Sequence, residues 1–221
     1  MKKILFILFL FPFTLFAQVT DDFFDGDFTQ NPTWSGTTEQ YTVNNSKQLQ
    51  LNAEGEGTAY LSLPITEYES MEWQFWIREA FAPSGNNYSD VWLSADNADL
   101  SQATQGYFLR FGEAGSSDAI TLFRKDAEGQ QQICRGTEAA IAASFAVSIK
   151  VTCDREGNWM IQTCYDNSGI YLIKHKVRII PTVKAAILVF GPSSLLATPR
   201  SFTSITSMSV LALPTMSRLN F

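Results

Sequence analysis

The sequence predicts an all-β protein, a sandwich or barrel of short antiparallel strands. Three observations predict it: a hairpin pattern over residues 106–124, alternation of apolar and polar residues in many other short segments, and turn residues between those segments at regular intervals. In the hairpin, residues 113–118 read E-A-G-S-S-D and turn the chain between two alternating runs. The predicted buried face consists of Tyr107, Leu109, Phe111, Ile120 and Leu122.

Further strands are expected before and after this hairpin. They cover residues 41–43, 47–51, 58–63, 70–81, 90–95, 130–134, 145–152 and 159–165. In the longest of them the predicted core face holds Met71, Trp73, Phe75 and Ile77, and the outer face holds Glu72, Gln74, Trp76 and Arg78. Only residues 137–143, T-E-A-A-I-A-A, have the composition of a short helix. Many short strands with one brief helix are typical of a sandwich or barrel.

Residues 1–17 predict a secretory signal peptide. They contain two lysines, a short apolar run interrupted by Pro12, and Ala17 before an expected mature start at Gln18. The run is too short for a membrane span. Later, Gly191 and Pro192 interrupt the one other apolar stretch. We therefore expect a secreted or cell-surface protein without a stable membrane span after signal removal.

Charge and residue counts exclude several classes of function. The chain has 16 Lys and Arg against 22 Asp and Glu, without the basic stripe that a nucleic-acid partner requires. The one histidine, His175, leaves little for histidine-based catalysis or zinc binding.

The three cysteines allow at most one internal bridge. The turn at residues 154–158 is expected to set Cys153 opposite a residue near Trp159 rather than opposite Cys164. We therefore expect no structural disulfide.

Four aspartates lie in the turn-rich segment 21–36, of which Asp22, Asp25 and Asp27 are candidate Ca²⁺ ligands because calcium prefers carboxylate and carbonyl oxygens. The alternative is that these carboxylates, with Asp21, bond nearby backbone amides in turns, and the Asp-Gly pattern favours it. The segment is expected to be anchored by Phe23, Phe24, Phe28 and Trp34.

Several motifs together resemble one family. They are D-F-F-D-G-D-F-T-Q-N-P-T-W-S-G from residue 22, F-A-P-S-G-N-N-Y from residue 81, the hairpin, C-R-G from residue 134 and D-R-E-G-N-W from residue 154. As a set they resemble the N-terminal domain of bacterial secreted proteins that also have lamin-tail domains, which is similar to concanavalin-A-like jelly rolls. The resemblance covers residues 18–168 and implies a non-catalytic surface or adhesion module. It supplies no catalytic residues, and we expect no lamin-tail domain in the residues that follow the jelly roll.

The tail, residues 169–221, differs in composition from the rest of the chain. All 22 acidic residues precede Asn167, and Ser, Thr, Leu, Pro and Ala dominate afterwards. Shifting the codon phase in two stretches of the tail permits sequences with strand-like alternation. The hypothesis is that the tail is translated out of frame and poorly ordered, so that the sandwich lacks its final strands and is a truncated fragment of a larger extracellular protein.

The candidate ligand residues are aromatic and arginine side chains on predicted outer faces: Trp76, Arg78, Trp92 and Arg110. If their strands are neighbours, rings can stack on sugars while guanidinium groups bind hydroxyls or carboxylates. The alternative is that the two tryptophans pack beneath loops. The expected partner is a carbohydrate or a cell-surface polymer.

A glycoside hydrolase of concanavalin-like fold is an alternative function, because Glu67, Glu69 and Glu72 approach the spacing of a carboxylate pair. Strict alternation, however, sets Glu72 on the face opposite to the other two. A structural spacer is the remaining alternative.

Overall fold

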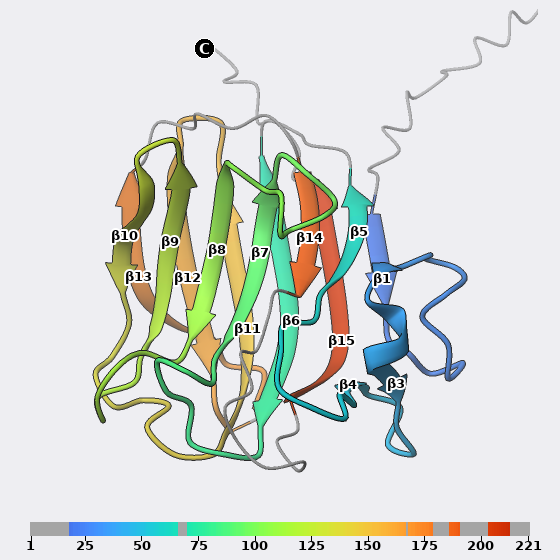
Figure 1. Cartoon of the computed structure of the whole chain (residues 1–221). Helices are drawn as coiled ribbons and strands as arrows, with labels where there is room; N and C mark the ends of the chain where they lie inside the picture. The colour runs from blue at the N-terminus through green and yellow to red at the C-terminus, as the bar shows by residue number, and fades with distance from the viewer. Residues whose placement is uncertain (1–17, 66–69, 167, 179–185, 191–202, 213–221) are drawn as a thin grey trace, which may run out of the picture.

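The structure, a computed structural model, describes residues 18–65, 70–166, 168–178, 186–190 and 203–212. Two antiparallel sheets pack face to face (Figure 1), which confirms the all-β sandwich. The only helix among these residues is a short 3₁₀ helix, η1 (Thr38–Gln40). No helix in the described ranges is long and apolar enough to cross a membrane.

Sheet A has eight strands. In spatial order they are β13 (Leu172–Arg178), β12 (Asn158–Cys164), β11 (Phe145–Cys153), β6 (Met71–Glu79), β15 (Thr203–Ala212), β4 (Leu49–Leu51) and β3 (Tyr41–Val43), with β1 (Gln18–Asp21) paired to β15.

Sheet B has seven strands. In spatial order they are β10 (Gly129–Arg135), β9 (Ile120–Asp126), β8 (Gly106–Phe111), β7 (Ser89–Ala95), β14 (Ala186–Phe190), β5 (Leu61–Ile65) and β2 (Ser35–Gly36).

The core lies between the sheets and contains the faces that alternation predicted. Strands β8 and β9 form the expected hairpin, and its five predicted apolar residues all belong to the main core. The predicted core face of β6 is buried as well. Tyr107 of sheet B packs on Trp159 of sheet A with ring centroids 4.8 Å apart, and Trp159 stacks on Trp73 at 5.6 Å.

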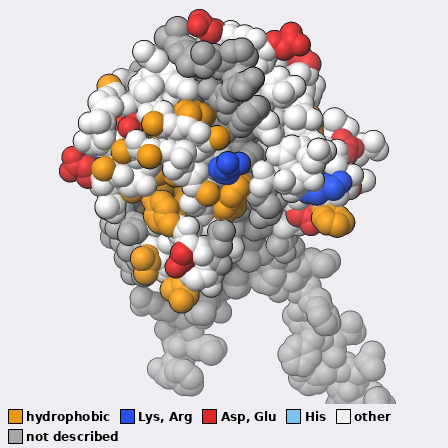
Figure 2. Space-filling model, turned by 90° about the horizontal axis from the view of Figure 1, so that it is seen from below, with side chains coloured by type: hydrophobic (Ala, Val, Ile, Leu, Met, Phe, Trp, Pro, Cys, Tyr) orange, Lys and Arg blue, Asp and Glu red, His pale blue; other side chains and the backbone are white. Residues whose placement is uncertain are grey.

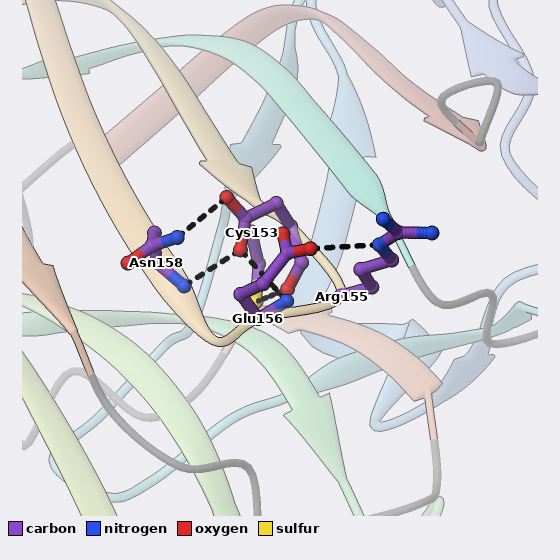
Figure 3. Close-up of polar contacts among 5 residues, drawn as sticks. Cys153, Arg155, Glu156 and Asn158 are labelled. Atoms are coloured by element: carbon purple, nitrogen blue, oxygen red, sulfur yellow. Dashed lines mark hydrogen bonds and ion pairs between the residues drawn. The ribbon is translucent and has the colours of Figure 1, made fainter. Parts of the chain in front are cut away.

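The turn between β11 and β12 shows how local polar bonds fix the register (Figure 3). The Asp154 carboxylate accepts hydrogen bonds from the backbone N–H groups of Glu156 and Asn158 at 3.0 and 2.8 Å. Gly157 supplies the left-handed conformation, with φ 76°. The prediction for Cys153 is confirmed, because it pairs with Trp159. All three cysteines have free thiols.

The helix expected at 137–143 is wrong. This segment is a series of turns, and Ala139 has φ 58°, which a right-handed helix does not permit. The N–H of Ala139 donates to the carbonyl of Ser117 and that of Ile141 to the carbonyl of Asp118, at 3.0 and 3.2 Å. Hydrogen bonds to a neighbouring loop therefore replace the hydrogen bonds that a helix would form. These bonds depend on tertiary packing, which the local composition does not predict.

The prediction that the final strands are missing is also wrong. Strand β15 lies between β6 and β4, and β14 lies between β7 and β5, so the tail completes both sheets. Ile205 pairs with Ile77 and Val210 with Trp73 along the backbone. Ladder bonds use backbone groups of any residue except proline, and neither strand contains proline. The reading-frame hypothesis concerns the coding DNA and stays a prediction. The predicted signal peptide, residues 1–17, lies outside the described residues.

Candidate functional site

The four predicted ligand residues do not form one surface. Trp76 and Arg78 lie on the outer face of β6 in sheet A, whereas Trp92 and Arg110 lie on the outer faces of β7 and β8 in sheet B. The whole core separates the two pairs. Alternation predicted correctly that all four point away from the core, but strand order decides which sheet each residue belongs to.

Trp92 is enclosed and not available to a ligand. Its side chain is 4 % exposed and belongs to a second hydrophobic cluster outside sheet B, with Ala95, Leu100, Ala103 and Phe108. The Trp92 and Phe108 rings stack with centroids 4.7 Å apart. The loop after β7 covers them and is held by the Asp96 carboxylate, which accepts the N–H groups of Thr104 and Gln105. The alternative weighed for the tryptophans, packing beneath a loop, is confirmed for Trp92.

Arg110 is held in a fixed orientation. Its Nε and Nη2 donate to the two carboxylate oxygens of Asp90 at 2.7 and 2.6 Å, a bidentate pair. The guanidinium carbon lies 4.2 Å from the Tyr88 ring centroid and 5.4 Å from that of Phe123. Burial raises the pKa of the Asp90 carboxyl, and the bonds from Arg110 oppose that rise.

A second ion pair continues the same row of sheet B. Arg110 pairs with Thr121 of β9, and Thr121 pairs with Arg135 of β10, so these residues share the outer face. Arg135 donates to both carboxylate oxygens of Glu113 and to the Ser117 carbonyl. We call Asp90, Arg110, Thr121 and Arg135 the arginine row. Sequence reasoning missed Thr121 and Arg135, because nothing in the sequence aligns β10 with β8.

Thr121 is the anomalous member of the arginine row. It is 3 % exposed, and its hydroxyl has no hydrogen-bond partner among the described residues. An unpaired buried hydroxyl costs about 1–3 kcal/mol. The two flanking arginine side chains keep 19 % and 29 % of their surface exposed. The arginine row therefore combines two partly exposed guanidinium groups with a buried hydroxyl, that of Thr121.

A buried carboxyl, Glu79, lies at the same end of the sandwich, on the core face where β6 ends. It is fully buried, and neither oxygen has a hydrogen bond of ordinary geometry to a described residue. Burial raises the pKa of Glu79 to about 8, an interaction with the Ser89 hydroxyl lowers it, and the charges of Asp118 and Asp90 raise it. Glu79 is therefore largely protonated at neutral pH.

Figure 2 views the sandwich from this end, where β6 and β8 finish in Figure 1. Hydrophobic side chains gather on one side of it, next to a basic side chain, and acidic side chains lie towards the rim. Exposed apolar residues also occur where β12 leads into β13, with Ile170 68 % and Leu172 57 % exposed.

The aspartates of segment 21–36 act within turns. Asp21, Asp22, Asp25 and Asp27 each accept the backbone N–H two residues ahead, at 2.8–3.0 Å. The turn interpretation is thus confirmed. No three His, Cys, Asp or Glu side chains within the described ranges are arranged to hold a metal ion. The predicted anchors Phe23, Phe28 and Trp34 are confirmed, because they are buried, whereas the prediction for Phe24 is wrong, because this residue is 73 % exposed.

The carboxylates considered for hydrolysis do not form a visible pair. Glu67 and Glu69 lie outside the described residues. Glu72 lies on the outer face of sheet A, where its carboxylate accepts a bond from the Gln74 amide and lies 3.4 Å from the Lys150 ammonium.

Known structures resemble this sandwich closely in fold. Lectin II from Ulex europaeus aligns over 88 % of this chain and 97 % of its own, with a TM-score of 0.62 and 12 % identity. A legume lectin-like domain from Entamoeba histolytica aligns over 82 % and 89 %, with a TM-score of 0.58 and 13 % identity. The fold is a legume-lectin-like, concanavalin-A-like jelly roll.

A third similar structure is the exoplasmic/lumenal domain of VIP36 in a Ca²⁺/Man-bound form, with a TM-score of 0.59, 8 % identity and 85 % of each chain covered. No protein-family model matches the chain, and no curated protein is significantly similar to it in sequence. Identities this low establish the fold alone.

Proposed function

We propose that this protein is a secreted, non-catalytic module that binds a carbohydrate or cell-surface polymer through the arginine row. The observation that supports it best is that two carboxylate-held arginines, Arg110 and Arg135, lie on one face of sheet B and keep 19 % and 29 % of their side-chain surface exposed. VIP36 in its Ca²⁺/Man-bound form and a lectin UEA-II complexed with galactose are structural neighbours that bind sugars.

The chemistry of the row suits neutral sugar hydroxyls. Each guanidinium has a carboxylate partner, so the row carries no large net charge that would select a charged ligand. Ion pairs fixed in this way offer a donor and an acceptor side by side, which matches neighbouring hydroxyls on a sugar ring. Tyr88 and Phe123 are half-buried beside Arg110 and supply apolar surface for the ring face.

The cellular setting of the proposal rests on the sequence. The lysine-containing apolar leader supports secretion, and the motif set supports membership of the N-terminal domains of lamin-tail-containing secreted proteins. On that basis the chain is a fragment of a larger extracellular protein with a surface or adhesion role.

Arg110→Lys and Arg135→Lys test the site, because each keeps the charge and loses the two-point contact with its carboxylate. We expect binding in a glycan array and in calorimetric titration to weaken about tenfold for each. Thr121→Val should bind like wild type, because its hydroxyl is buried. Its free energy of unfolding should stay the same or rise, because a buried unpaired polar group is removed.

Arg155→Lys is the matched control, because Arg155 lies in the exposed turn after β11. It should bind like wild type. If wild type binds no glycan, the module is a structural spacer. If wild type binds and both Arg110→Lys and Arg135→Lys bind equally well, the arginine row is not the site.

A further inference from the structure

The outer face of sheet A has a different composition from that of sheet B. Strands β6, β11 and β12 are neighbours, and their register sets outward residues in rows. One row is Gln74, Lys150 and Gln162, the next is Trp76, Ser148 and Cys164, and the third is Glu72, Thr152 and Met160. Apart from Cys164, which is buried, these side chains are half-buried, neither fully exposed nor covered.

Trp76 is the unusual residue of this face. It is half-buried, yet it belongs to none of the hydrophobic clusters of the described residues, unlike Trp73, Trp92 and Trp159. Its ring is therefore not part of the described clusters, and the exposed part of the ring is apolar surface that a ligand can cover. The next outward residue of β6, Arg78, is exposed.

Polar groups of both hydrogen-bonding kinds lie in the rows of β6 and β11 next to Trp76. The Glu72 carboxylate accepts a bond from Gln74 and lies 3.4 Å from the Lys150 ammonium, so its charge is compensated. The Tyr171 ring lies over this ammonium at 5.5 Å. Burial raises the pKa of the Tyr171 hydroxyl, and an interaction with Ser148 opposes that rise.

We infer that this face, the tryptophan face (Glu72, Gln74, Trp76, Ser148, Lys150 and Tyr171), is a second binding surface for a neutral polysaccharide chain. Amide, hydroxyl and charge-compensated groups satisfy sugar hydroxyls, and the Trp76 ring stacks on a sugar ring. Three strands at about 4.8 Å spacing span roughly 10 Å, the length of about two sugar units.

With two binding surfaces the protein can connect two polysaccharide chains. This part of the inference rests on the proposed function of the arginine row. The tryptophan face and the arginine row lie on the outer faces of opposite sheets, so one molecule can hold two polysaccharide chains at once. Two sites on opposite sides of a rigid sandwich cannot bind neighbouring segments of one short chain. They cross-link separate chains instead.

The test uses the full chain and three neutral polysaccharides: galactomannan, laminarin and xyloglucan. The protein is bound to polysaccharide-coated beads, and capture of the same polysaccharide in soluble, fluorescent form is measured. Wild type should capture it. Trp76→Ala should keep bead binding through the arginine row but lose capture by about tenfold, and Arg110→Lys should lose capture through the other site.

Phe24→Ala is the matched control, because it removes an exposed aromatic ring from the N-terminal segment and should capture like wild type. Near-UV circular dichroism establishes that Trp76→Ala is folded. Capture by folded Trp76→Ala at the wild-type level overturns the inference, as does absence of wild-type binding to all three polysaccharides.

Two further outcomes separate the alternatives. If sedimentation finds a wild-type dimer that Trp76→Ala converts to a monomer without loss of polysaccharide binding, a second copy covers the face and the inference is wrong. If neither wild type nor Arg110→Lys captures soluble polysaccharide, both bind the beads equally and Trp76→Ala does not bind them, the arginine row fails and bridging is overturned with it.

Discussion

Trp76 and Trp92 occupy equivalent positions in the two sheets, yet they have opposite surroundings. Each alternates outward on a strand whose other face lines the core. Trp92 lies beneath the loop after β7 in its own hydrophobic cluster, whereas Trp76 lies among polar side chains in no cluster. The contrast teaches that alternation separates inside from outside, while the packing of the loop that follows the strand decides whether an outward residue meets solvent.

The ion pairs of the two faces differ in the same way. Asp90 keeps only 4 % of its side-chain surface exposed and binds Arg110 at two points, whereas the pair between Glu72 and Lys150 is single, longer and more exposed. The ion pair of sheet B therefore holds Arg110 in one orientation, whereas the pair of sheet A lies on a more exposed polar surface. This is why we assign the arginine row a fixed recognition site and the tryptophan face an open one.

Replacing the two tryptophans gives the largest expected difference. Trp92→Ala removes a buried ring from a closed cluster and should lower the free energy of unfolding by about 3–5 kcal/mol. Trp76→Ala should lower it by less, about 1–2 kcal/mol, because the ring is half-buried on the outer face and belongs to no cluster of the described residues. Urea denaturation of both variants measures this, and equal losses would break the comparison.

Glu79, between the two sheets, should make stability depend on pH. Its folded-state pKa of about 8 lies above its ordinary value of 4.5, so the folded state binds the proton more tightly. Its contribution to stability is thus fully present below about pH 4.5 and is lost as pH rises to about 8, a change of a few kcal/mol. Denaturation at several pH values measures it.

Glu79→Gln is the companion variant, because glutamine has nearly the same shape and no titration. It should flatten the decline between pH 5 and 8. A variant whose stability declines in parallel with wild type over this range would show that another group is responsible.

Gly106 tests how closely the backbone of β8 packs on Trp92, and its replacement should lower the stability less than that of Trp92. A Cβ there would lie 2.2 Å from the Ser94 carbonyl oxygen and 2.8 Å from the Trp92 ring. Gly106→Ala should therefore cost about 2–3 kcal/mol. Gly129→Ala, where φ is +109° but no atom lies within 4 Å, should cost only about 1 kcal/mol of backbone strain. Equal Tm losses in calorimetry would refute the packing argument.

Much of the fold could be predicted from local pattern. Strand β3 matches its predicted range, the hairpin of β8 and β9 has the predicted buried face, and Cys153 pairs with Trp159 as expected. The site was predicted only in part. Arg110 was found because it lies outward on a strongly patterned strand, whereas Arg135 and Thr121 needed the register of three strands.

The sequence by itself determined the strands and their inner and outer faces, because the two-residue period of a strand is a local property. The tertiary structure alone decided which strands are neighbours, how the tail pairs, and which outward tryptophan is covered. These depend on backbone bonds and loop packing between residues far apart in the chain. For that reason β15 could take a central place in sheet A although its composition differs from that of every strand around it.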